Sequence, residues 1–161
     1  MSPQSRRLAG ILLVVFPTVI FGGVSVLSML IGDPAYAANE LRQDLWRAGH
    51  AHAGVLLILS LLSLRYVDEA ELSGAMKSVV RHAIPAAAIL LPTAFFLSIL
   101  SPNATQPNAV INLAYIGAIV LSVGLVILGV GLIRHPRKAR PDDEQDAMAC
   151  NSPQVTCCIL S

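Results

Sequence analysis

Two histidines, His50 and His52, lie in the stretch 48–64, which contains no acidic residue, lysine or arginine. Imidazole nitrogens bind haem iron and copper, and they gain or lose a proton near neutral pH. Met29 could add a thioether, because histidine with methionine is an axial pair for haem iron and a partial ligand set for copper. We therefore take His50, His52 and Met29 as candidate cofactor ligands for haem b or copper, with His50 and His52 as candidate metal ligands.

The spacing of the two histidines limits what they do together. Helical residues at i and i+2 point about 200° apart, so His50 and His52 do not chelate one ion as an i, i+4 pair does. Either each faces a different neighbouring helix, or only one faces the bundle. Alanine and glycine neighbours leave a side-chain-poor patch beside each ring, which accommodates another helix or a flat macrocycle. Two cofactor-free roles also stay open: hydrogen bonding to backbone or water, and proton transfer or substrate contact.

Four apolar segments position these side chains. A charge at the centre of a bilayer costs at least roughly 2.5 to 3.5 kcal/mol, and none occurs within 8–32, 48–64 or 82–133. The last run is too long for one helix, and its segment 101–108 is rich in proline and asparagine, which favours a turn. The sequence predicts an all-α membrane protein with one domain over 1–133 and four transmembrane helices, at about 8–32, 46–66, 83–100 and 109–133.

Lysine and arginine are distributed unevenly between the two ends of these spans. The end that holds His50 and His52 has only Arg42 and Arg47, and the other end has Arg6, Arg7, Arg65, Lys77, Arg81, Arg134, Arg137, Lys138 and Arg140. Cytoplasmic segments carry the excess of basic residues. We therefore expect both termini in the cytoplasm, with the two histidines at the extracytoplasmic end of the second span. His82 and His135 then lie at the opposite membrane surface, too distant to share that site.

Gly117, Gly124 and Gly131 recur at every seventh position of the fourth span. Residues seven apart lie close to one face of a helix, where small side chains let a neighbouring backbone approach. We expect these glycines to form a packing surface. The expected partners are the lipid bilayer and either further copies of the chain or a larger membrane complex.

The tail 134–161 is polar, contains prolines and lacks helical periodicity, which predicts a disordered cytoplasmic segment. It holds all three cysteines, for which no structural disulfide is expected in the cytoplasm. Its last four residues, Cys158 to Ser161, fit the prenylation pattern. Four transmembrane helices leave such an anchor little to add.

Composition and motifs exclude two classes of function. The 11 basic and 10 acidic residues give a formal net charge of +1, and no basic face is large enough to neutralise a run of nucleic-acid phosphates. The serines within the spans lack a base at a spacing that would activate them, so hydrolytic catalysis is not expected.

The run Arg47-Ala-Gly-His-Ala-His-Ala-Gly-Val-Leu-Leu-Ile-Leu-Ser60 resembles a segment of small four-helix bacterial membrane proteins, mostly actinobacterial. The resemblance extends over residues 6–134 and includes Ser101-Pro-Asn-Ala-Thr105. It implies the four-helix fold and a bacterial inner membrane, without implying an activity. The His-Ala-His triplet is also similar to segments of haem-copper oxidase-like subunits, whose further metal-binding histidines have no counterpart here.

Three functional hypotheses follow for this multi-pass protein of the inner (plasma) membrane. In the first, it is a redox or metal-binding membrane subunit in which His50 or His52 binds haem b or copper. In the second, it is a cofactor-free structural or accessory membrane protein. In the third, it is a small proton-coupled transporter-like protein that uses the two histidines as proton carriers.

Overall fold

The computed structural model describes residues 1–134, so the predicted disordered tail beyond Arg134, with its cysteines and His135, lies outside the described residues. Four long helices are α1 (Pro3–Gly32), α3 (Glu40–Tyr66), α4 (Gly74–Ser98) and α5 (Asn112–Ile133). The short helix α2 (Pro34–Ala37) joins α1 to α3, and the 3-10 turn η1 (Ala109–Ile111) leads into α5. All four long helices, the last taken together with η1, have the length and hydropathy to cross a membrane. The prediction of an all-α protein with four membrane-length helices is confirmed.

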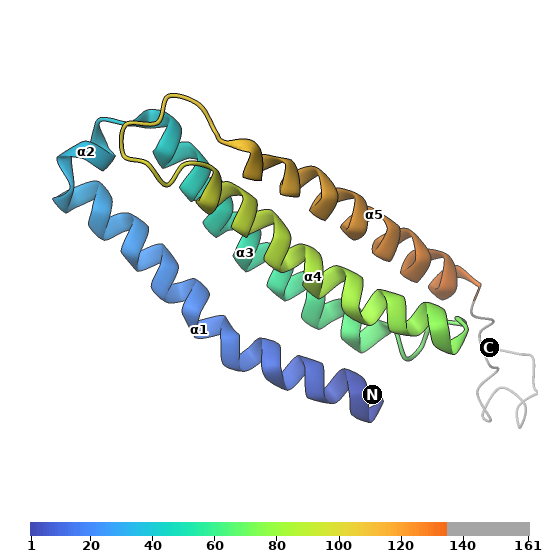
Figure 1. Ribbon diagram of the computed structural model, residues 1–161. Coiled ribbons are helices and arrows are strands. Elements are labelled where there is room, and N and C mark those ends of the chain that lie inside the picture. Colours follow the sequence, from blue (N-terminus) through green and yellow to red (C-terminus); the bar gives the residue numbers. More distant parts are fainter. Residues whose placement is uncertain (135–161) are drawn as a thin grey trace, which may run out of the picture.

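The long helices pack side by side in the order α1, α3, α4, α5 (Figure 1). α4 lies between α3 and α5 and contacts both extensively, whereas α1 packs mainly against α3 at one edge. The N-terminus and the end of α5 lie at one end of the molecule, which we call the terminal end. α2 and the loop 101–108 lie at the opposite end, which we call the loop end.

Side-chain caps set where the helices begin. Ser2, Asn39 and Ser73 each accept a hydrogen bond from a backbone N–H in the first turn of α1, α3 and α4. Because Ser73 caps α4, the helix begins at Gly74, ahead of the predicted span at 83–100. His82 therefore lies in the third turn of α4, and Arg81 is a helical residue as well.

The core follows α4. Buried Val80 and Ile84 pack with Leu128 near the terminal end, and buried Ala87 and Leu91 pack with residues of α3 nearer the loop end. The predicted packing glycines lie on the face of α5 that meets this helix. A Cβ added to Gly117 or Gly124 would lie 3.0 Å from a side-chain carbon of Leu91 or Ile84, respectively. The same addition at Gly131 would lie 2.6 Å from Leu72 of the α3–α4 loop, so α5 approaches its neighbours as closely as glycine allows.

Candidate functional site between α1 and α3

His50 lies in a groove between α1 and α3, towards the loop end, with a volume of about 600 Å³. His50 is the only polar side chain in the lining of this α1–α3 groove, which otherwise consists of Phe16, Val19, Ile20, Gly23, Val24, Leu27, Ala51, Gly54, Val55 and Ile58. The imidazole rests on α1 where Gly23 lacks a side chain, because a Cβ there would lie 2.7 Å from Nε2 of His50. Within residues 1–134 the ring makes no hydrogen bond or ion pair.

His52 faces a different helix. Its Nδ1 lies 2.8 Å from the carbonyl oxygen of Ala48, a hydrogen bond in which the protonated nitrogen donates. Its ring centroid lies 5.1 Å from that of Phe95 on α4, with the two planes tilted by 40°. Of the two arrangements that the i, i+2 spacing allows, the structure therefore has the one in which each histidine contacts its own neighbouring helix. The described residues also contain no group of three or more His, Cys, Asp or Glu side chains placed to hold a metal ion.

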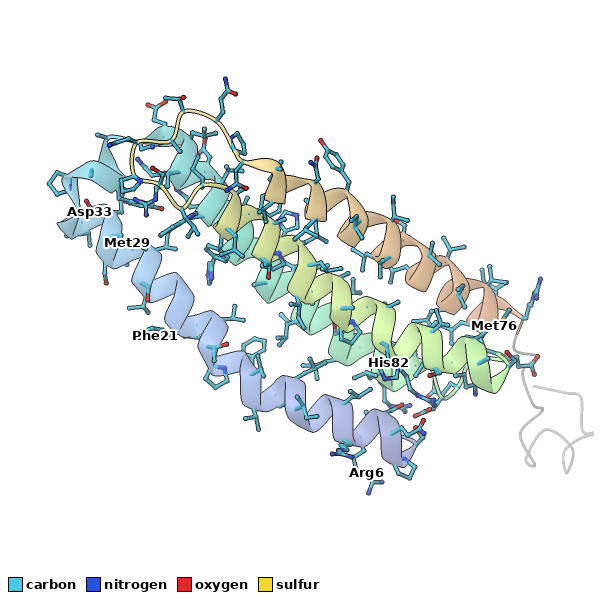
Figure 2. The ribbon with its side chains drawn as sticks, viewed as in Figure 1. Arg6, Phe21, Met29, Asp33, Met76 and His82 are labelled. Atoms are coloured by element: carbon cyan, nitrogen blue, oxygen red, sulfur yellow. The ribbon has the colours of Figure 1, made fainter. Side chains whose placement is uncertain are left out.

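Met29 lies on α1 beyond the α1–α3 groove. It is six positions after Gly23, which corresponds to about 9 Å along the helix axis towards the loop end, and it does not line the groove. Figure 2 shows it close to Asp33, at the α2 end of α1. Asp33 itself caps α2, accepting hydrogen bonds from the N–H groups of Ala35 and Tyr36. The structure thus brings His50 onto α1 without bringing Met29 to it.

An aromatic cluster around Arg42 is a feature that the sequence reasoning missed. The Arg42 guanidinium lies 4.4 Å from the ring centroid of Trp46 and 5.8 Å from that of Tyr36, a cation–π arrangement at the loop end. Arg42 is only 8% exposed, and within the described residues Tyr36 Oη, Arg42 Nε and Trp46 Nε1 have no hydrogen-bond partner. Burial raises the pKa of Tyr36, and the positive charges of Arg47 and Arg42 oppose that rise. The i, i+4 spacing of Arg42 and Trp46 on one helix was the available signal.

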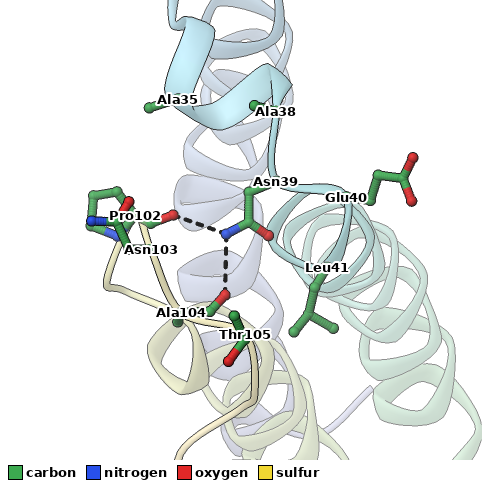
Figure 3. Close-up of a pocket in the computed structure, with 9 residues that line it drawn as sticks. All are labelled: Ala35, Ala38, Asn39, Glu40, Leu41, Pro102, Asn103, Ala104 and Thr105. Carbon is green, nitrogen blue, oxygen red and sulfur yellow. Dashed lines mark hydrogen bonds between the residues drawn. The ribbon is translucent and has the colours of Figure 1, made fainter.

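Asn39 ties the loop 101–108 to the start of α3. Its Nδ2 donates to the carbonyl oxygens of Pro102, at 2.9 Å, and Ala104, at 3.2 Å (Figure 3). These residues line a shallow pocket at the loop end whose single titratable side chain, Glu40, points away from the Asn39 contacts. We interpret this pocket as the place where the loop 101–108 attaches to α3, because Asn39 and the carbonyls of Pro102 and Ala104 hydrogen-bond to one another across it.

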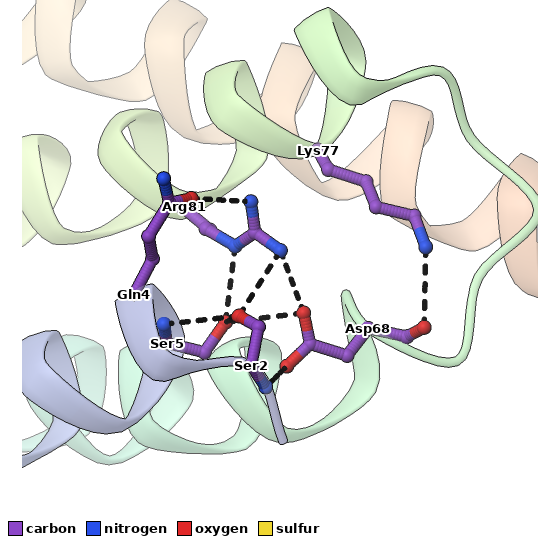
Figure 4. Close-up of polar contacts among 6 residues, drawn as sticks. All are labelled: Ser2, Gln4, Ser5, Asp68, Lys77 and Arg81. Atoms are coloured by element: carbon purple, nitrogen blue, oxygen red, sulfur yellow. Dashed lines mark hydrogen bonds and ion pairs between the residues drawn. The ribbon is translucent and has the colours of Figure 1, made fainter.

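At the terminal end a polar cluster, which we call the latch, holds the start of α1 (Figure 4). Arg81 Nη2 lies 2.6 Å from Asp68 Oδ1, and Arg81 Nε donates to Ser5 Oγ at 3.0 Å. The backbone N–H of Ser2 donates to Asp68 Oδ2 at 2.6 Å, and Lys77 Nζ donates to the Asp68 carbonyl at 3.1 Å. The latch therefore joins the first turn of α1 to the loop after α3 and to α4.

The latch sets the protonation state of its carboxylate. Partial burial by itself would raise the pKa of Asp68, but the backbone N–H of Ser2, Arg81 and the hydroxyls of Ser2 and Ser5 lower it to about 2. Arg81 is only 8% exposed, so this pair is far better shielded from solvent than a surface ion pair. Asp68 is consequently ionised at any physiological pH.

Comparison of the chain with protein-family models, with curated proteins and with solved structures gives no significant match. The structure shows a four-helix protein with four membrane-length apolar helices, and the comparisons identify no family for it.

Proposed function

We propose that the protein is a small membrane subunit that binds haem b in the α1–α3 groove, with His50 as the iron ligand. One observation carries this proposal: the His50 imidazole has no hydrogen-bond partner among residues 1–134, although it lies in an otherwise apolar groove of a membrane-length helix. Ionisable residues inside membrane helices mark functional sites, and a partly buried imidazole without a protein partner has a ring nitrogen to offer to iron.

The residues of the α1–α3 groove suit a flat and largely apolar group. Its volume of about 600 Å³ is within the range of roughly 300 to 1,000 Å³ that is usual for ligand and cofactor sites. The glycines of α1 and α3 leave parts of both walls without side chains. Arg47 lies one turn before His50 towards the loop end, where its guanidinium hydrogen-bonds to neutral Gln43, interacts with the Tyr36 phenol and pairs with no carboxylate among residues 1–134. We propose that its uncompensated positive charge attracts the propionates of haem b.

Haem b would supply one-electron redox chemistry, and the chain would bind it, orient it and exclude water from it. We assign a single protein ligand, because His52 is engaged with Ala48 and Phe95 on the other side of α3. For the same reason we do not assign a copper ion shared by His50 and His52. Met29 is not assigned as an axial ligand, because it lies beyond the groove.

Proton-coupled transport is the second candidate, and the same observation favours it. Ionisable side chains inside membrane helices form the proton relays of pumps and transporters, and the His50 imidazole is such a side chain, without a hydrogen-bond partner among residues 1–134. A cofactor-free accessory protein is the interpretation that remains if neither haem nor proton flux is found.

We further propose a bacterial inner membrane with both termini in the cytoplasm. The terminal end holds both the start of α1 and the end of α5, as an even number of spans requires. Within residues 1–134, six of the eight lysines and arginines belong to this end, which the distribution of basic residues assigns to the cytoplasm. Self-association, or membership of a larger complex, remains part of the proposal.

The test is the ultraviolet-visible spectrum of the purified full-length protein, oxidised and dithionite-reduced, with metal analysis of the same samples. His50→Ala and His52→Ala form a matched pair, because both remove an imidazole from α3 two positions apart. We expect a Soret band in the wild type and in His52→Ala, and its loss in His50→Ala. A colourless wild-type protein without metal contradicts the haem proposal, and proton flux in liposomes then decides between the other two candidates.

A further inference from the structure

A second groove lies at the terminal end, between α1 and α4, with a volume of about 350 Å³. Its lining nearest the chain start is polar: Gln4 and Arg7 of α1, and Ser78, Arg81 and His82 of α4. One and two turns further along α1 the lining becomes apolar, with Leu8 and Ile11. The residues come from single faces of the two helices, at i, i+3, i+4 and i+7 on α1 and at i, i+3 and i+4 on α4. We call this the basic groove.

We propose that the basic groove binds the phosphate of an anionic phospholipid from the adjoining membrane leaflet. Within residues 1–134 the lining contains no carboxylate, and Asp68, the acid that contacts Arg81, is already paired with it. Arg7 makes no hydrogen bond or ion pair within residues 1–134, so its charge is left without a partner. A net positive charge therefore remains in the groove, as in the basic pockets between transmembrane helices that bind lipid head groups.

The remaining polar groups of the basic groove have hydrogen bonds left to give. His82 Nδ1 lies 2.8 Å from the carbonyl oxygen of Ser78, which leaves Nε2 to donate when the ring is protonated. Gln4 Oε1 accepts from Arg81 Nη1 at 3.2 Å, which leaves the amide N–H groups of Gln4 unused. Phosphate oxygens only accept hydrogen bonds, so a lining of donors suits them.

The course of the groove favours a lipid over a free anion. Its polar part lies at the start of α1, and Leu8 and Ile11 continue it along the helix in the direction that leads into the bilayer. A phospholipid has the same order, from a charged head group to apolar chains. A free phosphate ion would make no use of the apolar part. The latch maintains the groove, because Arg81 is joined to Ser5 on the opposite helix.

The chain provides a matched pair of arginines for the test. Both side chains are exposed, but Arg7 lines the basic groove and Arg6 points away from the bundle (Figure 2). We would measure the thermal unfolding of the full-length protein in detergent during titration with phosphatidylglycerol, with phosphatidylcholine or with inorganic phosphate. We expect phosphatidylglycerol to raise the unfolding temperature more than phosphatidylcholine does, and inorganic phosphate to have little effect.

Arg7→Gln should weaken the apparent affinity for phosphatidylglycerol about fivefold, and Arg6→Gln less than twofold. His82→Gln should weaken it as well, through a residue of the other helix. Equal losses in Arg6→Gln and Arg7→Gln would mean that only diffuse surface charge attracts the lipid, which overturns the site. Equal effects of the two lipids also overturn it, and protection by inorganic phosphate equal to that by phosphatidylglycerol overturns the lipid as its occupant. None of these measurements depends on whether haem binds near His50.

Discussion

The interfaces on the two sides of the α3–α4 pair are built on different principles. α5 packs against α4 through Gly117 and Gly124, whose missing side chains are replaced by aliphatic carbons of α4. α1 packs against α3 through Gly23, which meets the ring of His50 in the lining of the α1–α3 groove. Ser5, at the latch, is the only buried residue of α1.

This difference separates a closely packed helix, α5, from a loosely packed one, α1. Lipid chains are as apolar as the helix surfaces, so burying apolar surface between helices in a bilayer gives no hydrophobic stabilisation. Close packing and hydrogen bonds therefore decide how firmly a helix is held. α5 has the close packing along its length. α1 has the latch at one end and the α2 connection at the other, with few close contacts between them. Both proposed ligand sites lie beside α1, where the packing leaves room for a ligand.

The largest expected effect comes from breaking the latch. Asp68→Asn removes one partner of the shielded ion pair and leaves the Arg81 guanidinium without its counter-charge. We expect a loss of about 3 kcal/mol in the free energy of unfolding, measured in mixed detergent micelles. Glu69→Gln is the matched control, because its pair with Arg65 is exposed and should contribute less than about 1 kcal/mol. Equal losses in the two variants would show that the latch does not hold α1.

The latch also predicts a pH dependence. Folding lowers the pKa of Asp68 from 3.8 to about 2, so the carboxylate stabilises the folded state at every pH above about 4. This contribution, about 2.5 kcal/mol, should decline as the pH falls from about 4 to 2. The measurement is the free energy of unfolding against pH in wild type and in Asp68→Asn. A difference between the two proteins that stays constant down to pH 2 would contradict the assignment.

The α4–α5 interface should respond to added volume. Gly124→Leu places side-chain atoms where Ile84 and Ala83 already lie, and we expect a cost of about 2 kcal/mol in the free energy of unfolding. Gly129→Leu is the matched control on the same helix, because nothing lies within 4 Å of its missing Cβ. This control should be neutral or slightly stabilising, since leucine favours the helix over glycine. Similar losses in both would mean that α5 is not closely packed through Gly124.

The sequence predicts what depends on hydropathy and on local helix geometry. Charge-free runs gave the four helices, and the i, i+2 spacing correctly limited His50 and His52 to separate directions. Which helix each ring contacts depends on the tertiary arrangement, because His50 meets Gly23 on α1 while His52 meets Phe95 on α4. No periodicity within α3 distinguishes those two neighbours.

The latch could not be predicted from the sequence either, because it also depends on the tertiary arrangement. Arg81 had the pattern of a basic loop residue that orients the protein in the membrane, and its pairing with Asp68 was not apparent. The hydrogen bonds from Ser2 and Ser5 to Asp68 join residues more than 60 positions apart, which no local pattern encodes. The helix α4 extends beyond the predicted span at 83–100, because the cap at Ser73 starts the helix ahead of the charge-free run and includes charged residues such as Lys77.

The smallest expected effect tests the looser interface directly. Gly23→Ala places a Cβ 2.7 Å from Nε2 of His50, so the imidazole must move. Because this neighbour is the free end of one side chain, and alanine favours the helix over glycine, we expect the free energy of unfolding to change by less than about 1 kcal/mol. Gly22→Ala is the matched control, since its Cβ would lie at an ordinary 3.9 Å from the same ring. If Gly23→Ala costs as much as Gly124→Leu, then α1 is packed as closely as α5, and the α1–α3 groove has no room for a ligand.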